Sequence, residues 1–73
     1  MIGQAVQLLD VVALIEDVLQ SGLRRGQVGT VVEALDQNAY LVEFSDDEGR
    51  AYAIVPLTVN QMLVLQYEQA EVV

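Results

Sequence analysis

The feature that most constrains the fold of this chain is its series of short apolar segments rich in β-branched residues, each ended by a cluster of turn residues. Segments of this length and composition are typical of β-strands in a small meander or barrel. We predict five of them, at Asp10–Ile15, Val28–Leu35, Ala39–Ser45, Arg50–Val55 and Met62–Gln66. The chain should therefore adopt an all-β fold, with the last strand pairing against the first.

The connections between these strands narrow the architecture. Glu16–Gly26 is too long for a hairpin turn, so we expect a structured loop whose Leu19 and Leu23 fold back over the open end of the barrel. Pro56 should end the fourth strand because proline cannot donate to a ladder, and Leu57–Gln61 fits a short 3₁₀ turn. This order predicts a small five-stranded barrel like that of Src-homology-3 domains, with a long first loop and a 3₁₀ turn before the last strand.

Several single residues carry predictions about local geometry. Gly49 should supply a positive φ at the end of the Asp46–Gly49 turn, and Asn38 suits a left-handed conformation in the turn before it. Gly29, inside the second strand, predicts a bulge or a tight bend. The third strand alternates, and the face expected to point inward carries Tyr40, Val42 and Phe44.

A chain of 73 residues makes one domain. We assign the barrel to residues 10–66. Residues 1–9 fit a short helix, an extra strand or a frayed end, and residues 67–73 form a tail. No leader or membrane-spanning run is evident, so a cytoplasmic location is expected.

The chain lacks most of the side chains that enzymes use as bases and nucleophiles. It has no histidine, no cysteine and no lysine. We therefore predict a protein that is not an enzyme and has no cofactor. The acidic turn at Asp46, Asp47 and Glu48 is the best candidate for a cation site. However, Leu57 stands where the EF-hand spacing requires glutamate, and a solvated turn is the favoured interpretation.

The net charge of −8 argues against nucleic acids and anionic membranes as partners, because both would repel the chain. A basic protein is the natural partner. Arg24 and Arg25 are candidates for contact with an anionic group of that partner, and pairing with nearby acids is the alternative.

The hydrophobic share of 53% is high for a small domain, so part of it should lie at the surface as an interface. This predicts a protein partner or a homodimer, and a tightly packed monomer is the alternative. We expect the interface just after the fourth strand, at Leu57, Val59, Met62, Leu63 and Leu65. Packing in the core is the alternative role for Met62. A proline-peptide groove lined by Tyr40, Tyr52 and Tyr67 is disfavoured, since the first loop has no aromatic residue.

Four stretches of the chain together resemble a known family: LLDVVALIED, GLRRGQVGTVVEAL, AYLVEFSDDEGRAYAIVPL and NQMLVL. They are similar to the bacterial family called domain of unknown function 4926. The resemblance implies a small bacterial protein, with a role as the antidote, immunity or regulatory half of a two-gene pair. Separately, Gly22–Leu35 resembles the KOW element, which implies an alternative association with nucleic acid or the ribosome. A structural subunit of a larger assembly is a third hypothesis.

Overall fold

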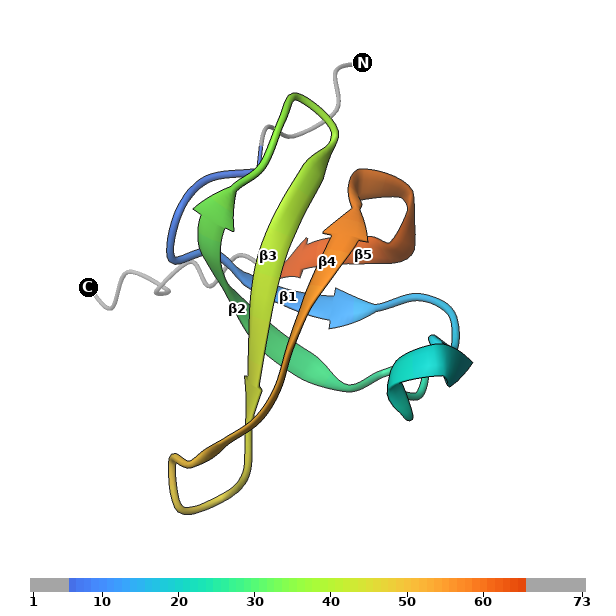
Figure 1. Cartoon of the computed structure of the whole chain (residues 1–73), viewed down its shortest axis with the longest axis vertical. Helices are drawn as coiled ribbons and strands as arrows, with labels where there is room; N and C mark the ends of the chain where they lie inside the picture. The colour runs from blue at the N-terminus through green and yellow to red at the C-terminus, as the bar shows by residue number, and fades with distance from the viewer. Residues whose placement is uncertain (1–5, 66–73) are drawn as a thin grey trace, which may run out of the picture.

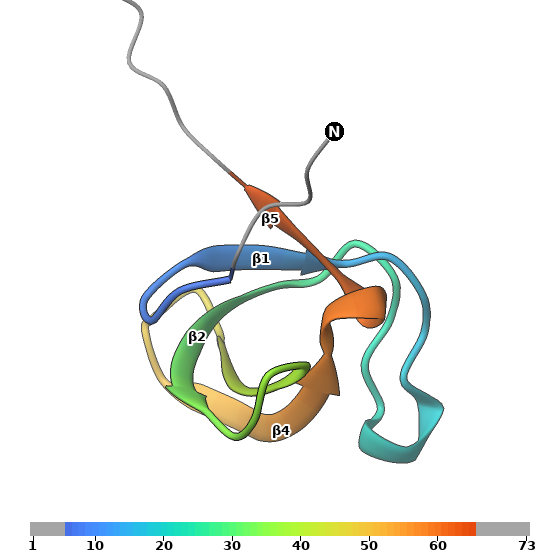
Figure 2. The same ribbon diagram turned by 90° about the horizontal axis from the view of Figure 1, so that it is seen from above.

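The computed structural model describes residues 6–65, which form one antiparallel sheet of five strands (Figure 1). The strands are β1 (Val11–Leu14), β2 (Val28–Ala34), β3 (Ala39–Ser45), β4 (Ala51–Thr58) and β5 (Met62–Leu65). Two 3₁₀ turns, η1 (Leu19–Ser21) and η2 (Val59–Gln61), are the helical elements of the described part. The strand order is β4-β3-β2-β1-β5, and the sheet curls into a barrel-like shape (Figure 2).

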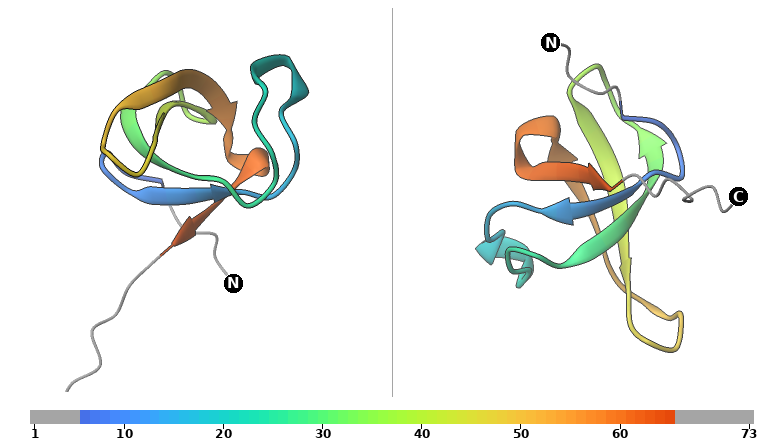
Figure 3. Two further views of the ribbon diagram at one scale, coloured as in Figure 1. Left: turned by 90° about the horizontal axis from the view of Figure 1, so that it is seen from below. Right: turned by 180° about the vertical axis from the view of Figure 1, so that it is seen from behind.

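The all-β prediction and the order of its elements are confirmed. β3 has the predicted bounds, η2 precedes the last strand, and β5 pairs with β1 from Val11↔Leu65 to Leu14↔Met62. Figure 3 shows β5 beside β1 when the molecule is viewed from behind. The more specific likeness to Src-homology-3 domains stays a prediction.

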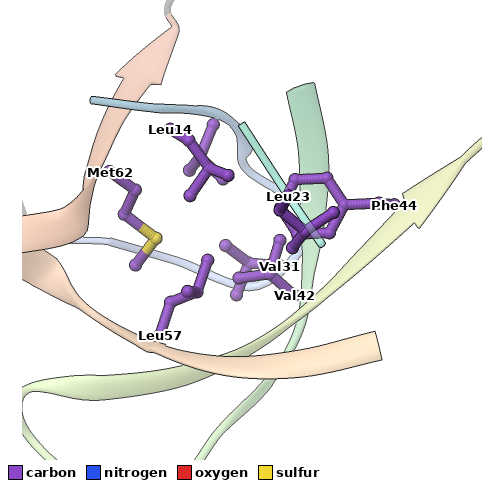
Figure 4. Close-up of a cluster of buried hydrophobic side chains, with 8 residues drawn as sticks. Leu14, Leu23, Val31, Val42, Phe44, Leu57 and Met62 are labelled. Atoms are coloured by element: carbon purple, nitrogen blue, oxygen red, sulfur yellow. The ribbon is translucent and has the colours of Figure 1, made fainter. Parts of the chain in front are cut away.

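The core consists of apolar side chains that the curled sheet turns inward (Figure 4). Eight of them are buried: Val12, Leu14, Leu23, Val31, Val42, Phe44, Leu57 and Met62. Burying one such side chain stabilises a fold by about 1.5–3 kcal/mol, so eight make the core the main source of stability. The predicted inward face of β3 is confirmed, with Val42 and Phe44 buried and Tyr40 half-buried against the core.

Gly29 does not form a bulge, so that half of the prediction is wrong, and the tight bend stays a prediction. Gly29 pairs directly with Val12, and a Cβ atom on Gly29 would lie 2.8 Å from Val42 Cγ1 and 2.9 Å from the Glu43 carbonyl oxygen. The position therefore requires glycine because β3 approaches its backbone closely. The irregularity in β2 lies between Val31 and Glu33.

Pro56 does not end the fourth strand, which continues to Thr58, and this prediction is also wrong. The reason is the direction of its backbone nitrogen. Val59 N–H donates to Asn38 O at 3.0 Å, across the β3–β4 ladder. Because backbone groups alternate in direction along a strand, the nitrogen of Pro56 faces the open edge of the sheet. No ladder hydrogen bond is lost there, so proline is tolerated.

The long first loop is structured as predicted, but its two leucines differ. Val18 and Leu23 exchange backbone hydrogen bonds of 2.9 and 3.1 Å, which closes a small turn around η1. Leu23 enters the core, whereas Leu19 lies at the outer tip and is 75% exposed. The prediction that Leu19 caps the barrel is therefore wrong, since the turn carries it away from the core.

The short turns follow the predictions in part. Gly49 has the expected positive φ of 83°. Asn38 is not left-handed, which corrects the prediction: its N–H donates to Asp36 Oδ1 at 2.7 Å, and this local bond shapes the turn. Gln7–Asp10 forms a turn closed by Asp10 N–H donating to Gln7 O at 3.1 Å, and within it Leu9 has φ 72° and donates its N–H to Val31 O at 2.7 Å. The calls on residues 1–5 and 66–73, including the tail, lie outside the described residues.

Candidate functional site: an apolar face of the sheet

The alternation of side chains along β5, β1 and β2 places apolar residues on the outside of the barrel as well as inside. Residues opposite each other in an antiparallel pair lie on the same face of the sheet. Val12, Leu14 and Met62 point inward, so the residues between them point outward. The register then gives two outward rows across the three strands, Leu63–Ala13–Val28 and Leu65–Val11–Thr30.

We call the apolar members of these two rows the outer face: Leu63, Leu65, Val11, Ala13 and Val28. The side chain of Leu63 is 56% exposed and that of Val28 is also exposed, while the other three are half-buried. Thr30 completes the rows without adding a charge. Six adjacent uncharged positions, five of them apolar, are notable in a chain of net charge −8.

Acidic residues border the outer face. Glu43 lies opposite Thr30 in the next strand and so continues the same outward row. Asp10 immediately precedes β1, and its carboxylate accepts a hydrogen bond of 2.9 Å from Gln7 N–H. Glu16 follows β1 and accepts one of 3.3 Å from the Gln61 amide. The arrangement is an apolar centre with a negative border.

The structure separates the five predicted interface residues. Leu57 and Met62 are buried in the core, where they contribute to stability. Val59 in η2 is half-buried and packs against that core. Leu63 and Leu65 lie on the outer face. A role in binding for these last two residues stays a prediction.

The arginines fall into two groups. Arg50 pairs with Asp46 at 3.6 Å and with Glu48, which holds the β3–β4 turn. Arg24 and Arg25 are exposed, and among residues 6–65 neither side chain forms an ion pair. Their backbones are held by hydrogen bonds: Arg25 N–H donates to Asp17 Oδ1 at 2.8 Å, and Arg24 N–H donates to Gln27 Oε1. Their predicted contact with an anionic group therefore stays open.

The first loop and η2 enclose a shallow concavity of about 330 Å³. It is lined by Glu16, Asp17, Val18, Leu19, Gln20 and Gln61. Both carboxylates accept hydrogen bonds from the protein itself. The concavity lies beside the start of β5 and thus at one end of the outer face.

The acidic turn at Asp46 is organised by its own backbone. Asp46 Oδ1 accepts hydrogen bonds of 2.9 Å from both Glu48 N–H and Arg50 N–H. Within residues 6–65, no group of three or more acidic side chains is placed to hold a metal ion. The same residues contain no helix that is long and apolar enough to cross a lipid bilayer.

The tyrosines do not gather into a groove in the described part. Tyr40 packs against the core, and the ring of Tyr52 lies 6.5 Å from that of Phe44. The Tyr52 hydroxyl accepts a hydrogen bond of 2.9 Å from the Gln27 amide. Tyr67 lies outside the described residues.

Sequence reasoning missed three members of the outer face, Val11, Ala13 and Val28. Their strands were predicted, but which side of each strand faces out depends on the register. A signal was present in the sequence, because VVAL and MLVL have no polar residue at alternate positions. Strands that are apolar on both faces in a small sheet indicate a second covered surface.

These features define a small acidic barrel-like domain with an apolar outer face. The chain also matches the family model of domain of unknown function 4926 over residues 8–64, and it belongs to that family. This confirms the resemblance seen in the sequence. The comparisons with curated proteins and with solved structures gave no significant match.

Proposed function

We propose that this protein is a non-enzymatic interaction module that binds a partner protein through its outer face. The observation that carries the proposal is the uninterrupted apolar surface of Leu63, Ala13 and Val28 across three strands. Burial of this surface against a partner would release about 25 cal/mol for each Å² removed from water. In the setting of a two-gene pair, the barrel would serve as the antidote or regulatory half.

The negative charge of the chain and of the borders of the outer face favours a basic partner protein. The outer face has acids on its borders, and the whole chain carries eleven acidic residues against three arginines. A partner with an apolar centre and basic surroundings would be attracted at long range and then desolvated at the centre. A second copy of the chain would be repelled, and nucleic acid would be repelled in the same way.

The test is affinity capture from the native host with three forms of the full chain. Leu63→Glu places a charge in the centre of the outer face. Ile54→Glu is the matched control, since Ile54 on β4 is 52% exposed and Leu63 is 56% exposed. We expect the wild type and Ile54→Glu to hold the same protein at a fixed ratio, and Leu63→Glu to lose it.

Circular dichroism of each variant ensures that lost binding is not lost folding. Equal capture by Leu63→Glu and the wild type would contradict the proposal, because the partner would then bind elsewhere. A captured complex that dissolves after nuclease treatment would also contradict it and would favour the KOW-like alternative. Raising the salt concentration should weaken the capture, since the borders of the face are charged.

A further inference from the structure

β5 is an edge of the sheet, and the hydrogen bonds of β1 show which backbone groups that edge presents. Leu14 faces β2, because its N–H donates to Gln27 O at 2.9 Å and its carbonyl accepts from Gly26 N–H at 2.7 Å. Ile15 faces the other way, since its N–H donates to Gln61 O at 3.0 Å. Directions alternate along a strand, so every second residue of β1 bonds to β5.

The register transfers this alternation to β5. The residues of β1 that face β5 are paired with Leu63 and Leu65. The backbone groups of these two leucines therefore form hydrogen bonds with β1. Met62 and Val64 turn theirs toward the open edge. Met62 N–H is used locally, in a bond to Val59 O. Within residues 6–65, the edge thus presents three groups: the carbonyl of Met62 and both the N–H and the carbonyl of Val64.

The described residues of this edge carry no charge, proline or bulge. β5 reads Met-Leu-Val-Leu, with no proline and no charge, and its pairing with β1 has no irregularity. Edges that must stay unpaired are usually protected by charges, prolines or bulges. Its outward residues, Leu63 and Leu65, belong to the outer face, so a strand added here would extend that face by one row.

We propose that an extended segment of the partner protein pairs with the open edge of β5 as a sixth strand. This inference rests on the proposed function and specifies the partner's element. Main-chain hydrogen bonds to Val64 would supply the register, and alternate apolar side chains of the segment would pack beside Leu63 and Leu65.

The acidic residues near β5 indicate which charged residues the partner's extended segment should carry. Glu16 and Asp17 line the concavity beside the start of β5. The end of the segment that passes this loop should carry lysine or arginine, since these carboxylates favour a positive charge. Pairing between the β5 strands of two copies is disfavoured for the same reason, because each copy carries a net charge of −8.

The test uses the full chain and a random library of short displayed peptides, selected at low salt. The selected peptides should alternate apolar residues and carry lysine or arginine at one end. Their affinity is then measured for Val64→Pro and Val64→Ala. Alanine shortens the side chain but keeps the backbone N–H, whereas proline removes the N–H that faces the edge. We expect Val64→Pro to bind roughly tenfold more weakly than Val64→Ala.

A second measurement does not depend on the proline variant. Hydrogen exchange of the Val64 amide in the wild type should slow roughly tenfold when the selected peptide binds, because a new hydrogen bond protects it. An unchanged rate, equal affinities of the two variants, or a selection that yields no such peptide would overturn the inference. Dimers that form through β5 at micromolar concentration would overturn it in favour of a second copy.

The outcome for Leu63→Glu separates this inference from the proposed function. If Leu63→Glu loses the partner while Val64→Pro keeps it, the outer face binds without strand addition, and only the sixth strand is wrong. If both variants keep the partner, the proposed function and the inference are both wrong.

Discussion

The two edges of the sheet differ in the features that keep an edge strand from pairing. β4 is the longer edge, with eight residues, and it combines a proline directed at the open side with an irregularity between Ala51 and Ala53 opposite β3. β5 has four residues and neither device. Natural sheets protect the edges that must remain single. The long edge carries these two features and the short one carries neither, which is why we propose β5 as the edge that pairs with a partner.

The faces beside these edges differ as well. The outward row next to β5 is apolar over three strands, from Leu63 to Val28. Beside β4, the outward Ile54 is paired with Glu43, and this charge interrupts the apolar surface. The edge and the apolar face on which the two proposals rest therefore occur together on one side of the molecule.

The largest expected effect on stability comes from placing proline where the backbone N–H bonds to a neighbouring strand, compared with placing it where the N–H faces an open edge. Val55→Pro removes an N–H that bonds to β3, so we expect a loss of about 3 kcal/mol in the free energy of unfolding. Val64→Pro removes an N–H that faces the open edge and should cost about 1 kcal/mol through lost packing. Urea denaturation measures both. Similar losses would show that Val64 bonds within the sheet.

A smaller loss of stability is expected where the inward face of β2 packs closely against β3. Gly29→Ala places a Cβ against Val42 and the Glu43 carbonyl, and the latter cannot move without shifting β3. We expect a loss of about 2 kcal/mol in stability. Val28→Ala, one residue away on the outer face, should cost well under half of that. A neutral Gly29→Ala would mean that β3 does not approach β2 this closely.

Removing the protection of β4 should change association more than stability. Pro56→Val restores an N–H at the open edge and should alter the free energy of unfolding by less than about 1 kcal/mol. At high salt, which screens the repulsion between two copies of net charge −8, it should also self-associate more than the wild type in sedimentation velocity as its concentration rises. Adding Ile54→Lys to the same edge should reverse that change. A monomeric Pro56→Val would show that proline is not the protecting device.

The smallest effect is expected at the β3–β4 turn. Arg50→Gln breaks the ion pairs with Asp46 and Glu48, whose side chains are largely exposed to water. Surface pairs of this kind contribute about 0.5 kcal/mol. Thermal unfolding at low and high salt should show a small difference that disappears as salt increases. A large loss would mean that the turn supports the protected edge.

The sequence was sufficient for the elements of the fold because their signals are local. β3 alternates within its own seven residues, and Gly49 ends a recognisable turn, so both were predicted correctly. The end of the strand at Pro56 and the bulge at Gly29 were predicted wrongly for a shared reason. Whether a proline nitrogen faces an edge, or a strand approaches a glycine, depends on the pairing of distant segments.

The same limit applies to the candidate site. The apolar surplus pointed to the segment around β5, and Leu63 and Leu65 do lie on the outer face. Leu57 and Met62 belong to the core, because their strands turn those positions inward. The alternation within β4 and β5 was visible in the sequence, but not which of its two sides the barrel would enclose.

The most direct test of the central claim is an NMR map of the full chain with the captured partner. The account predicts that the amide signals of the outer face and of Val64 shift or broaden when the partner is added, while those around Ile54 on β4 stay in place. Changes centred on β4, or on the Asp46–Gly49 turn, would contradict the claim that the β5 side of the molecule is the side that binds.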